Sequence, residues 1–250
     1  ANIPLLYQSL QKIFKSLSEV YEYELIYVND GSSDGSLSML QNLKNKDPQI
    51  TILHFSRNFG HQAAITAGLK EASGDFIITM DADLQDPPEL IPAMIKKATS
   101  GTDVVYARRK KRNEGLLKRG FAALYYGLLK KISSVSIPEH VGDYRLINKQ
   151  VLTVLNNCPE RARYIRGLVA WLGFKHAFVE FDRPHRKNGI TGYSWTKMFK
   201  LGFDGFTGFS NFPLRIAAFV GVFIIITAIL MFGYVTWDFL LRGVYYPLFK

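Results

Sequence analysis

Two carboxylates stand one residue apart directly after a strongly apolar run. Asp81 and Asp83, with Ala82 between them, follow residues 76–80, which read Phe-Ile-Ile-Thr-Met. At the end of a buried strand these carboxylates would repel each other unless a cation or a hydrogen-bond donor lies between them. Hard oxygen ligands of this kind suit Mg²⁺ or Mn²⁺, which complete their coordination with substrate phosphates and water. Although the Asp-x-Asp spacing alone is common, its position here favours a metal site.

A second polar segment follows the apolar run at residues 25–28. It reads Asn-Asp-Gly-Ser-Ser-Asp-Gly over residues 29–35. Taken alone, the segment is most simply a turn followed by a helix, with Asp34 as the N-cap residue. Because both acidic segments come directly after apolar runs, we expect both to lie where an α/β sheet binds its ligands.

The elements that position these residues alternate between short apolar runs and helical periodicity. Such alternation predicts an α/β domain with a parallel sheet, in which ligands bind beyond the carboxyl ends of the strands. The predicted strands cover residues 25–28, 50–53, 76–80 and 104–106, and the predicted helices cover 36–44, 61–72 and 88–98. Asn2, Ile3 and Pro4 indicate a helix start with no strand before it. At 250 residues, the chain can hold one such domain and a small appendage.

The appendage is an uncharged apolar run from Ile216 to Trp237. About 20 apolar residues cross the hydrocarbon core of a bilayer as a helix, so this run predicts a transmembrane helix. Arg215 precedes the run and most basic residues lie N-terminal to it, which favours a cytoplasmic location for the larger part of the chain. Residues 244–250 look like the start of another apolar segment, so we expect a multi-pass membrane protein.

The chain has a formal net charge of +10, from 31 Lys and Arg against 21 Asp and Glu, which indicates an anionic partner. Nucleic acid, phospholipid headgroups and a phosphorylated substrate all fit that charge. Nucleic acid is the least favoured, because the basic residues lack interleaved aromatic residues and any recognisable binding module. The single cysteine, Cys158, excludes an internal disulfide framework and a cysteine-rich zinc site.

Five motifs follow one another in the chain: NDGSSDG at 29–35, SRNFGHQAA at 56–64, MDADLQDPP at 80–88, GDYRL at 142–146 and RKNGIT at 186–191. Together with the apolar run after them, they resemble family-2 glycosyltransferases of the polyprenyl-phosphate type. That group includes dolichol-phosphate mannose synthases and bactoprenol glucosyltransferases. The resemblance covers nearly the whole chain, and several motifs in the right order are more specific than any one of them.

The resemblance implies a GT-A fold, which is a Rossmann-like α/β domain with a mostly parallel sheet, followed by amphipathic juxtamembrane helices and transmembrane helices. The expected division is 1–190 for the catalytic domain, 191–212 for the juxtamembrane segment, 213–237 for a transmembrane helix, and 238–250 for a short loop and the start of a second one. Relatives carry a first strand and a Pro-x-Tyr-Asn-Glu loop ahead of the position of Ala1. We therefore expect the sequence to be trimmed at both ends.

On the donor side, the resemblance implies that Asp30 and Asp81 contact the nucleoside of a nucleotide sugar. Asp83, with Gln85 beside it, would hold Mg²⁺ or Mn²⁺ on the diphosphate. Arg186 matches an arginine of the family that contacts the same diphosphate.

On the acceptor side, the resemblance places Arg108, Lys118 and Arg119 near the acceptor phosphate and assigns Asp143 as the catalytic base. A phosphate monoester has a second pKa of about 6, so most acceptor molecules are already dianionic at neutral pH and a base gains little. We therefore expect Asp143 to act at least partly by orienting the acceptor or Arg145, which we also assign to the acceptor phosphate.

The predicted reaction moves a hexose from a nucleotide sugar to a polyprenyl phosphate with inversion, at the cytoplasmic face of a bacterial inner membrane. The motif at 142–146 favours UDP-glucose as the donor. GDP-mannose and another UDP-sugar, such as an aminoarabinose derivative, stay open, as does an inactive membrane-tethered nucleotide-sugar sensor. A processive polysaccharide synthase is disfavoured because the chain has no Arg-Trp pair. Membrane lipids are a further expected partner, and relatives with such a short anchor can form homo-oligomers, for example tetramers.

Overall fold

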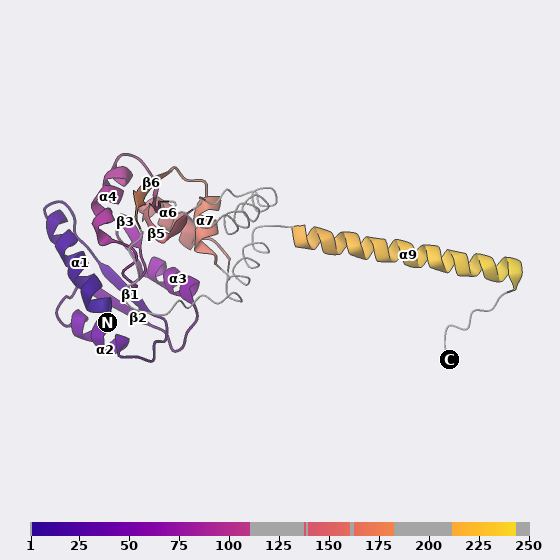
Figure 1. The fold of residues 1–250 in the computed structure, drawn as a ribbon, viewed down its shortest axis with the longest axis horizontal. Helices are drawn as coiled ribbons and strands as arrows, with labels where there is room; N and C mark the ends of the chain where they lie inside the picture. Colours follow the sequence, from indigo (N-terminus) through magenta and orange to yellow (C-terminus); the bar gives the residue numbers. More distant parts are fainter. Residues whose placement is uncertain (1, 111–137, 139, 161–162, 183–211, 244–250) are drawn as a thin grey trace.

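The computed structural model describes residues 2–110, 138, 140–160, 163–182 and 212–243, with the backbone alone for 212–216. In this part of the chain, helices enclose two β-sheets, and one long helix leads away from them (Figure 1). The strands are β1 (Leu25–Asn29), β2 (Ile50–His54), β3 (Phe76–Thr79), β4 (Val104–Arg109), β5 (Val141–Asn148) and β6 (His176–Phe181). The helices are α1 (Asn2–Leu17), α2 (Ser36–Lys44), α3 (His61–Glu71), the 3-10 turn η1 (Pro88–Leu90), α4 (Ile91–Thr99), α6 (Lys149–Asn156), α7 (Ile165–Trp171) and α9 (Phe212–Arg242).

Most of the elements expected from the sequence are present. All four predicted strands occur as β1 to β4, and α2 has the predicted bounds. The segment at 88–98 divides into η1 and α4. The predicted cap of α2 is wrong, because Gly35 rather than Asp34 occupies the N-cap position. Asp34 nevertheless contributes, since its Oδ1 accepts a hydrogen bond from the backbone N–H of Ser36 (3.0 Å).

The sheet is mixed, which corrects the expectation of a mostly parallel sheet. β1 and β2 form a parallel pair, and the other strands form a four-stranded sheet in the order β3–β5–β4–β6. β4 and β6 are parallel, whereas β5 runs antiparallel to both of its neighbours. β5 was not predicted from the sequence, because its charged residues Asp143 and Arg145 do not match the apolar pattern of a buried strand.

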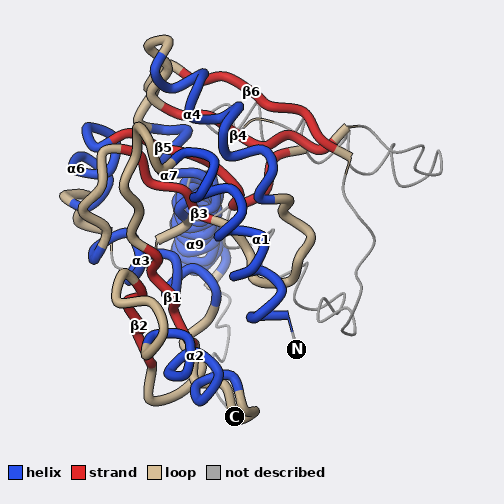
Figure 2. Tube along the Cα trace, turned by 90° about the vertical axis from the view of Figure 1, so that its left-hand side faces the viewer, coloured by secondary structure: helices blue, strands red, loops and turns tan. Residues whose placement is uncertain are grey.

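The core of the four-stranded sheet is divided between its two faces, because successive side chains of a strand point in opposite directions. In β4, Val104 and Tyr106 pack with α3, α6 and α7, while Val105 and Ala107 pack with α1 and α4. The two layers can be followed around the strands in Figure 2. This layering decides which helices can contribute side chains to each face of β5.

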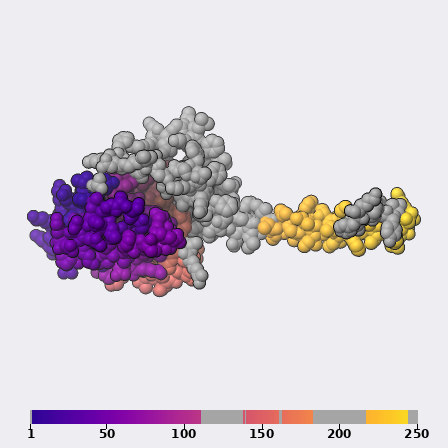
Figure 3. Space-filling view, turned by 90° about the horizontal axis from the view of Figure 1, so that it is seen from below, coloured from indigo at the N-terminus to yellow at the C-terminus, as the bar shows by residue number. Residues whose placement is uncertain are grey.

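α9 contains the run predicted to cross a membrane. Its 31 residues correspond to about 46 Å at 1.5 Å per residue. Within the described residues, 217–242 is the one helical stretch long and apolar enough to span a membrane, and its most apolar part contains no buried residue. Figure 3 shows this helix projecting beyond the α/β layers.

The helix continues through 238–242, where a loop was expected, and Arg242 pairs there with Asp238 at 3.2 Å. Residues 191–211 and 244–250 lie outside the described residues. The described part of the chain therefore supports one candidate span, and it does not support a multi-pass arrangement.

Candidate active site

The carboxylate of Asp30 ties the polar segment after β1 to the segment before α3. Its two oxygens accept hydrogen bonds from the backbone N–H groups of Phe59 (2.7 Å) and Gly60 (2.9 Å). The neighbouring Gly31 has a φ of 63°, and a Cβ at this position would lie 2.3 Å from the carbonyl carbon of Arg57. Only glycine fits there. Asp30, assigned to the nucleoside from the sequence, thus closes a tightly packed loop.

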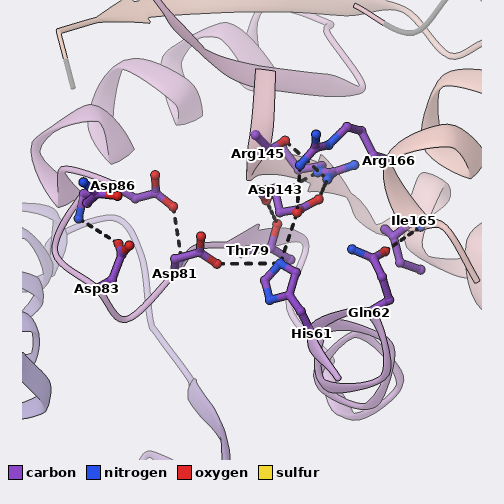
Figure 4. A network of polar contacts seen from close by, with 12 residues as sticks. His61, Gln62, Thr79, Asp81, Asp83, Asp86, Asp143, Arg145, Ile165 and Arg166 are labelled. Carbon is purple, nitrogen blue, oxygen red and sulfur yellow. Dashed lines mark hydrogen bonds and ion pairs between the residues drawn. The ribbon is translucent and has the colours of Figure 1, made fainter. Parts of the chain in front are cut away.

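The loop after β3 gathers the carboxylates of Asp81, Asp83 and Asp86 (Figure 4). Asp83 Oδ1 accepts a hydrogen bond from the backbone N–H of Gln85 (3.0 Å), and Asp86 Oδ2 accepts one from the backbone N–H of Asp81 (3.0 Å). Leu84 has a φ of 64°, a conformation that a bulky side chain rarely adopts. Backbone strain of this kind clusters at ligand sites, where the surrounding structure maintains it.

Ionising the carboxylates of this loop is energetically unfavourable, as the raised pKa values of two of them indicate. Burial raises the pKa of Asp81, and the nearby charge of Asp83 raises it further. Burial also raises the pKa of Asp86 to about 6. A cation beside the loop would relieve this repulsion.

The donor atoms of the loop fit Mg²⁺ or Mn²⁺, because these ions prefer carboxylate oxygens and need only one or two of them. Among the described residues, no group of three or more His, Cys, Asp or Glu side chains is arranged to hold a metal by itself. Of the two residues assigned to the metal, Gln85 is buried and Asp83 is partly exposed. Asp83 is therefore the more accessible ligand.

β5 is attached to the acidic loop and to β3 by two side-chain hydrogen bonds. Tyr144 Oη donates to the carbonyl oxygen of Pro87 (2.8 Å), and Thr79 Oγ1 donates to the carbonyl oxygen of Asp143. Tyr144 belongs to the core on the α1 and α4 side. Since neighbouring residues of a strand point to opposite faces, Asp143 lies on the side of α3 and α7.

Asp143, the predicted catalytic residue, is buried among two arginines and a histidine from three elements (Figure 4). Oδ1 accepts a hydrogen bond from Arg145 of β5 itself. Oδ2 lies 3.0 Å from Nη2 of Arg166 in α7 and 3.1 Å from Nε2 of His61 at the start of α3.

Burial alone would raise the pKa of Asp143. The hydrogen bond with His61 and the charges of Arg145 and Arg166 outweigh burial and hold that pKa well below its usual range. Asp143 is therefore ionised at neutral pH, and so low a pKa makes it a weak proton acceptor.

His61 links the two acidic regions, because its Nε2 also lies 3.8 Å from Asp81 Oδ1. The hydrogen bond with Asp143 raises the pKa of His61, and the charge of Asp81 adds to that effect. The next residue, Gln62, fixes the neighbouring helix, since its Oε1 accepts a hydrogen bond from the backbone N–H of Ile165 (2.9 Å). One turn of α3 thus positions the imidazole and the start of α7 together.

The basic residues assigned to phosphates are distributed differently from the sequence-based expectation. Arg145 is buried, with 2% of its side chain exposed, and serves as an internal partner of Asp143. Lys118, Arg119 and Arg186 lie outside the described residues.

Arg108 is held away from the acidic loop by β6. It forms an ion pair with Glu180 and stacks on the ring of Phe178 at 4.3 Å. The charge of the adjacent Arg109 offsets part of the rise in the pKa of Asp81. The pairing of β4 with β5 shifts register between Tyr106 and Arg108, and such irregularities redirect side chains.

Three residues near this site were missed from the sequence. Asp86 lies inside the recognised motif at 80–88 but was not assigned a role from the sequence. Arg109 directly follows Arg108, which was assigned to the acceptor phosphate. Arg166 carried a signal of its own, because it is the one charged residue in the apolar segment 165–171, IRGLVAW. A lone charge on a buried helix needs a partner, and here that partner is Asp143.

Comparison with known proteins gives consistent matches. The family model for glycosyl transferase family 2 matches residues 3–155. The bactoprenol glucosyl transferase of Shigella phage SfV is 40% identical over 236 residues, covering 94% of this chain and 75% of that protein. The uncharacterized glycosyltransferase YkcC of Bacillus subtilis (strain 168) is 45% identical over 217 residues, covering 86% of this chain and 67% of that protein. Among solved structures, the mannosyltransferase PcManGT from Pyrobaculum calidifontis, in complex with GDP-Man and Mn²⁺, aligns with a TM-score of 0.47 and 17% identity over 74% of this chain and 55% of that chain.

The mixed sheet between two helical layers, with its acidic loop after β3, is a GT-A glycosyltransferase fold. The chain belongs to glycosyl transferase family 2. The matched region includes the Asp30 loop, the acidic loop and Asp143, whereas Arg166 lies beyond it.

Proposed function

We propose that this glycosyltransferase moves glucose from UDP-glucose to a polyprenyl phosphate at a membrane surface, with inversion. The observation that carries the proposal is the position of His61 Nε2, which lies 3.8 Å from Asp81 and 3.1 Å from Asp143. One imidazole thereby joins the carboxylate assigned to the donor with the carboxylate assigned to the acceptor. Relatives named bactoprenol glucosyl transferase, including the Shigella phage SfV protein at 40% identity over 94% of this chain, support both the sugar and the lipid.

On the donor side, the proposal includes a divalent cation, Mg²⁺ or Mn²⁺, held by Asp83 with Gln85 beside it. When bound, such an ion supplies Lewis-acid stabilisation of the departing diphosphate. Asp30 and Asp81 would contact the nucleoside, and Arg186 would contact the diphosphate. The support for these roles is the order of the family motifs and the clustering of carboxylates after β3.

On the acceptor side, Asp143 would orient the acceptor phosphate rather than deprotonate it. Its pKa is held too low for efficient proton transfer near neutral pH. Arg145, Arg166 and His61 fix the carboxylate from three directions, so the acceptor meets charges that need no rearrangement. The proposal retains the other basic residues assigned to the acceptor phosphate: Arg108, Lys118 and Arg119.

α9 would keep the enzyme beside its lipid acceptor. Large apolar side chains are exposed along this helix, among them Phe219, Phe232 and Leu240, and bilayer lipids would cover them. The basic residues ahead of the helix favour a cytoplasmic catalytic domain. Further spans and a homo-oligomer stay predictions.

The test uses membranes that contain the chain, supplied with polyprenyl phosphate, Mg²⁺ and a panel of labelled nucleotide sugars. We expect a labelled lipid from UDP-glucose, dependent on added polyprenyl phosphate and suppressed by EDTA. Label from GDP-mannose or from another UDP-sugar would replace the donor assignment. Nucleotide-sugar binding without any lipid-linked product would favour the membrane-tethered sensor.

A further inference from the structure

The two arginines at Asp143 differ in their access to solvent. Arg145 is 2% exposed and holds Oδ1 from inside the core, whereas Arg166 is 28% exposed and holds Oδ2. Asp143 itself is 8% exposed. A ligand that approaches Asp143 from solvent can therefore reach Arg166, while the guanidinium of Arg145 is shielded.

The backbone around Arg166 is firmly held. Ile165, Leu168 and Val169 of α7 are buried in the core shared with α3 and α6. The backbone N–H of Ile165 also donates to Gln62 of α3, which ties the two helices at their first residues. The guanidinium of Arg166 consequently stands at a defined place beside Asp143, as Figure 4 shows.

Two permanently charged guanidinium groups contact the one carboxylate of Asp143. Arg145 and Arg166 carry permanent positive charges, and Asp143 supplies one negative charge between them. His61 is shared between Asp143 and Asp81, so Asp81 offsets any charge on the imidazole. An anion that approaches from solvent therefore meets the permanent positive charge of Arg166 on the exposed side.

We propose that Arg166 binds the phosphate of the lipid acceptor, and that Arg145, assigned to this role from the sequence, is instead the internal counter-ion of Asp143. A guanidinium offers a planar set of donors that matches phosphate oxygens. The ligand class is a phosphate monoester on a lipid tail. The inference rests on the proposed function, because it names the residue that meets the acceptor in that reaction.

The first test is kinetic and compares the wild type with Arg166→Ala, Arg166→Lys and Lys175→Ala. Losing a hydrogen bond between charged groups should raise the KM for polyprenyl phosphate about tenfold to a hundredfold in Arg166→Ala. The KM for the nucleotide sugar should not change. Arg166→Lys, which keeps the charge, should recover part of the loss. Lys175→Ala is the matched control, since it removes an exposed positive charge just after α7 and should behave as the wild type.

An unchanged KM for polyprenyl phosphate in Arg166→Ala, with a lower kcat alone, would overturn the proposal and leave Arg166 as a positioning residue for Asp143. If Arg166→Ala does not fold, Arg166→Lys and Arg166→Gln replace it. The lysine variant should then have the lower KM for the acceptor, and equal values would reject the proposal.

A second measurement separates this inference from the proposed activity. The detergent-solubilised full chain is titrated calorimetrically with a short-chain polyprenyl phosphate and, separately, with phosphatidylglycerol. We expect the wild type to bind the polyprenyl phosphate more tightly, and Arg166→Ala to lose that preference. Equal binding of both lipids by the wild type would identify a general anionic headgroup site instead. A wild type that binds polyprenyl phosphate through Arg166 but transfers no sugar would reject the activity and not the binding role.

Discussion

The acidic loop after β3 and the strand β5 place aspartate side chains in opposite electrostatic environments. Asp81 and Asp86 lie near one another and near Asp83, and burial raises the pKa of both. Asp143 is more buried than Asp81, yet its hydrogen bond with His61 and the charges of Arg145 and Arg166 lower its pKa. The protein neutralises Asp143 with its own residues and leaves the loop with excess negative charge. This difference indicates that the protein itself balances the carboxylate of Asp143, whereas the loop leaves negative charge that the proposed cation would offset.

The largest effect is expected from Asp143→Asn, which removes the charge between Arg145 and Arg166. We expect kcat/KM to fall about 10²–10³-fold, as when a preorganised charge contact is lost. The free energy of unfolding at neutral pH should fall by about 3–5 kcal/mol, because Arg145 would be left buried without its counter-ion. Denaturant unfolding and steady-state kinetics measure the two effects.

The pH dependence of the same variant tests the role of Asp143. The pKa of Asp143 is lower in the folded state, so its stabilisation is present above the unfolded pKa of about 3.9 and is lost as the pH falls through the folded value. The stability difference from the wild type should thus shrink in acid, and it should also fall as the pH rises through the raised pKa of His61, because the pairing of His61 with Asp143 is then lost. The rate loss should be independent of the ionisation of Asp143, and a loss that follows an ionisation other than that of His61 would restore Asp143 as a base.

Asp83→Ala should produce the next largest effect, because it removes the carboxylate of the acidic loop that we assign to the metal. We expect at least about a hundredfold loss of turnover at saturating Mg²⁺, given the several kcal/mol that a metal contributes to charge stabilisation. Titration of activity with Mg²⁺ and Mn²⁺ measures it, with the exposed Asp75→Ala as the control. Near-normal activity of Asp83→Ala would remove the metal assignment.

Asp86→Asn should stabilise the folded protein at alkaline pH, whereas replacing a paired acidic residue usually destabilises it. Since the pKa of Asp86 rises to about 6 on folding, the folded state binds its proton more tightly than the unfolded state does. Stability is therefore greatest below the unfolded pKa and falls as the pH rises through the folded value. In EDTA, the variant should be more stable than the wild type at alkaline pH by about 3 kcal/mol, a figure set by a shift of roughly two pKa units at about 1.4 kcal/mol each. Thermal unfolding across pH checks this, and a wild type that is more stable at all pH values would contradict it.

Tyr144→Phe should have the smallest effect, because it removes one hydrogen bond between β5 and the acidic loop. We expect a loss of about 1 kcal/mol in stability and a modest rise in the KM for the nucleotide sugar. Urea unfolding and donor titration measure these changes. If the donor KM stays constant, the loop keeps its shape without β5.

The parts of the fold that follow from apolar periodicity could be predicted from the sequence. β1 to β4 and α2 occur where the pattern places them, and α9 follows from composition alone. β5 could not be predicted in this way, because Asp143 and Arg145 are compatible with a buried strand only when they pair with each other and with distant residues. Tertiary contacts there override the local pattern.

Site residues that belong to sequence motifs could be predicted, whereas residues that pair with distant parts of the chain could not. Asp81, Asp83 and Asp143 were selected from family motifs, and their roles stay predictions, although the structure brings Asp81 and Asp143 to the same imidazole, that of His61. Arg166 is separated from its partner Asp143 by 23 residues, so no local spacing reveals the pair. The choice between Arg108 and Arg109 depends on the register shift in β4, which alternation along a strand does not show.

The crowding around Gly31 bears on attempts to change the donor by mutagenesis. The backbone of Arg57 and Asn58 occupies the space that any larger side chain at position 31 would need. Libraries that randomise the 29–35 loop would lose their folded members at this position before selection for a new nucleotide could begin. Diversity is better introduced at the exposed Ser32 and Ser33, where the loop can vary without displacing its neighbour.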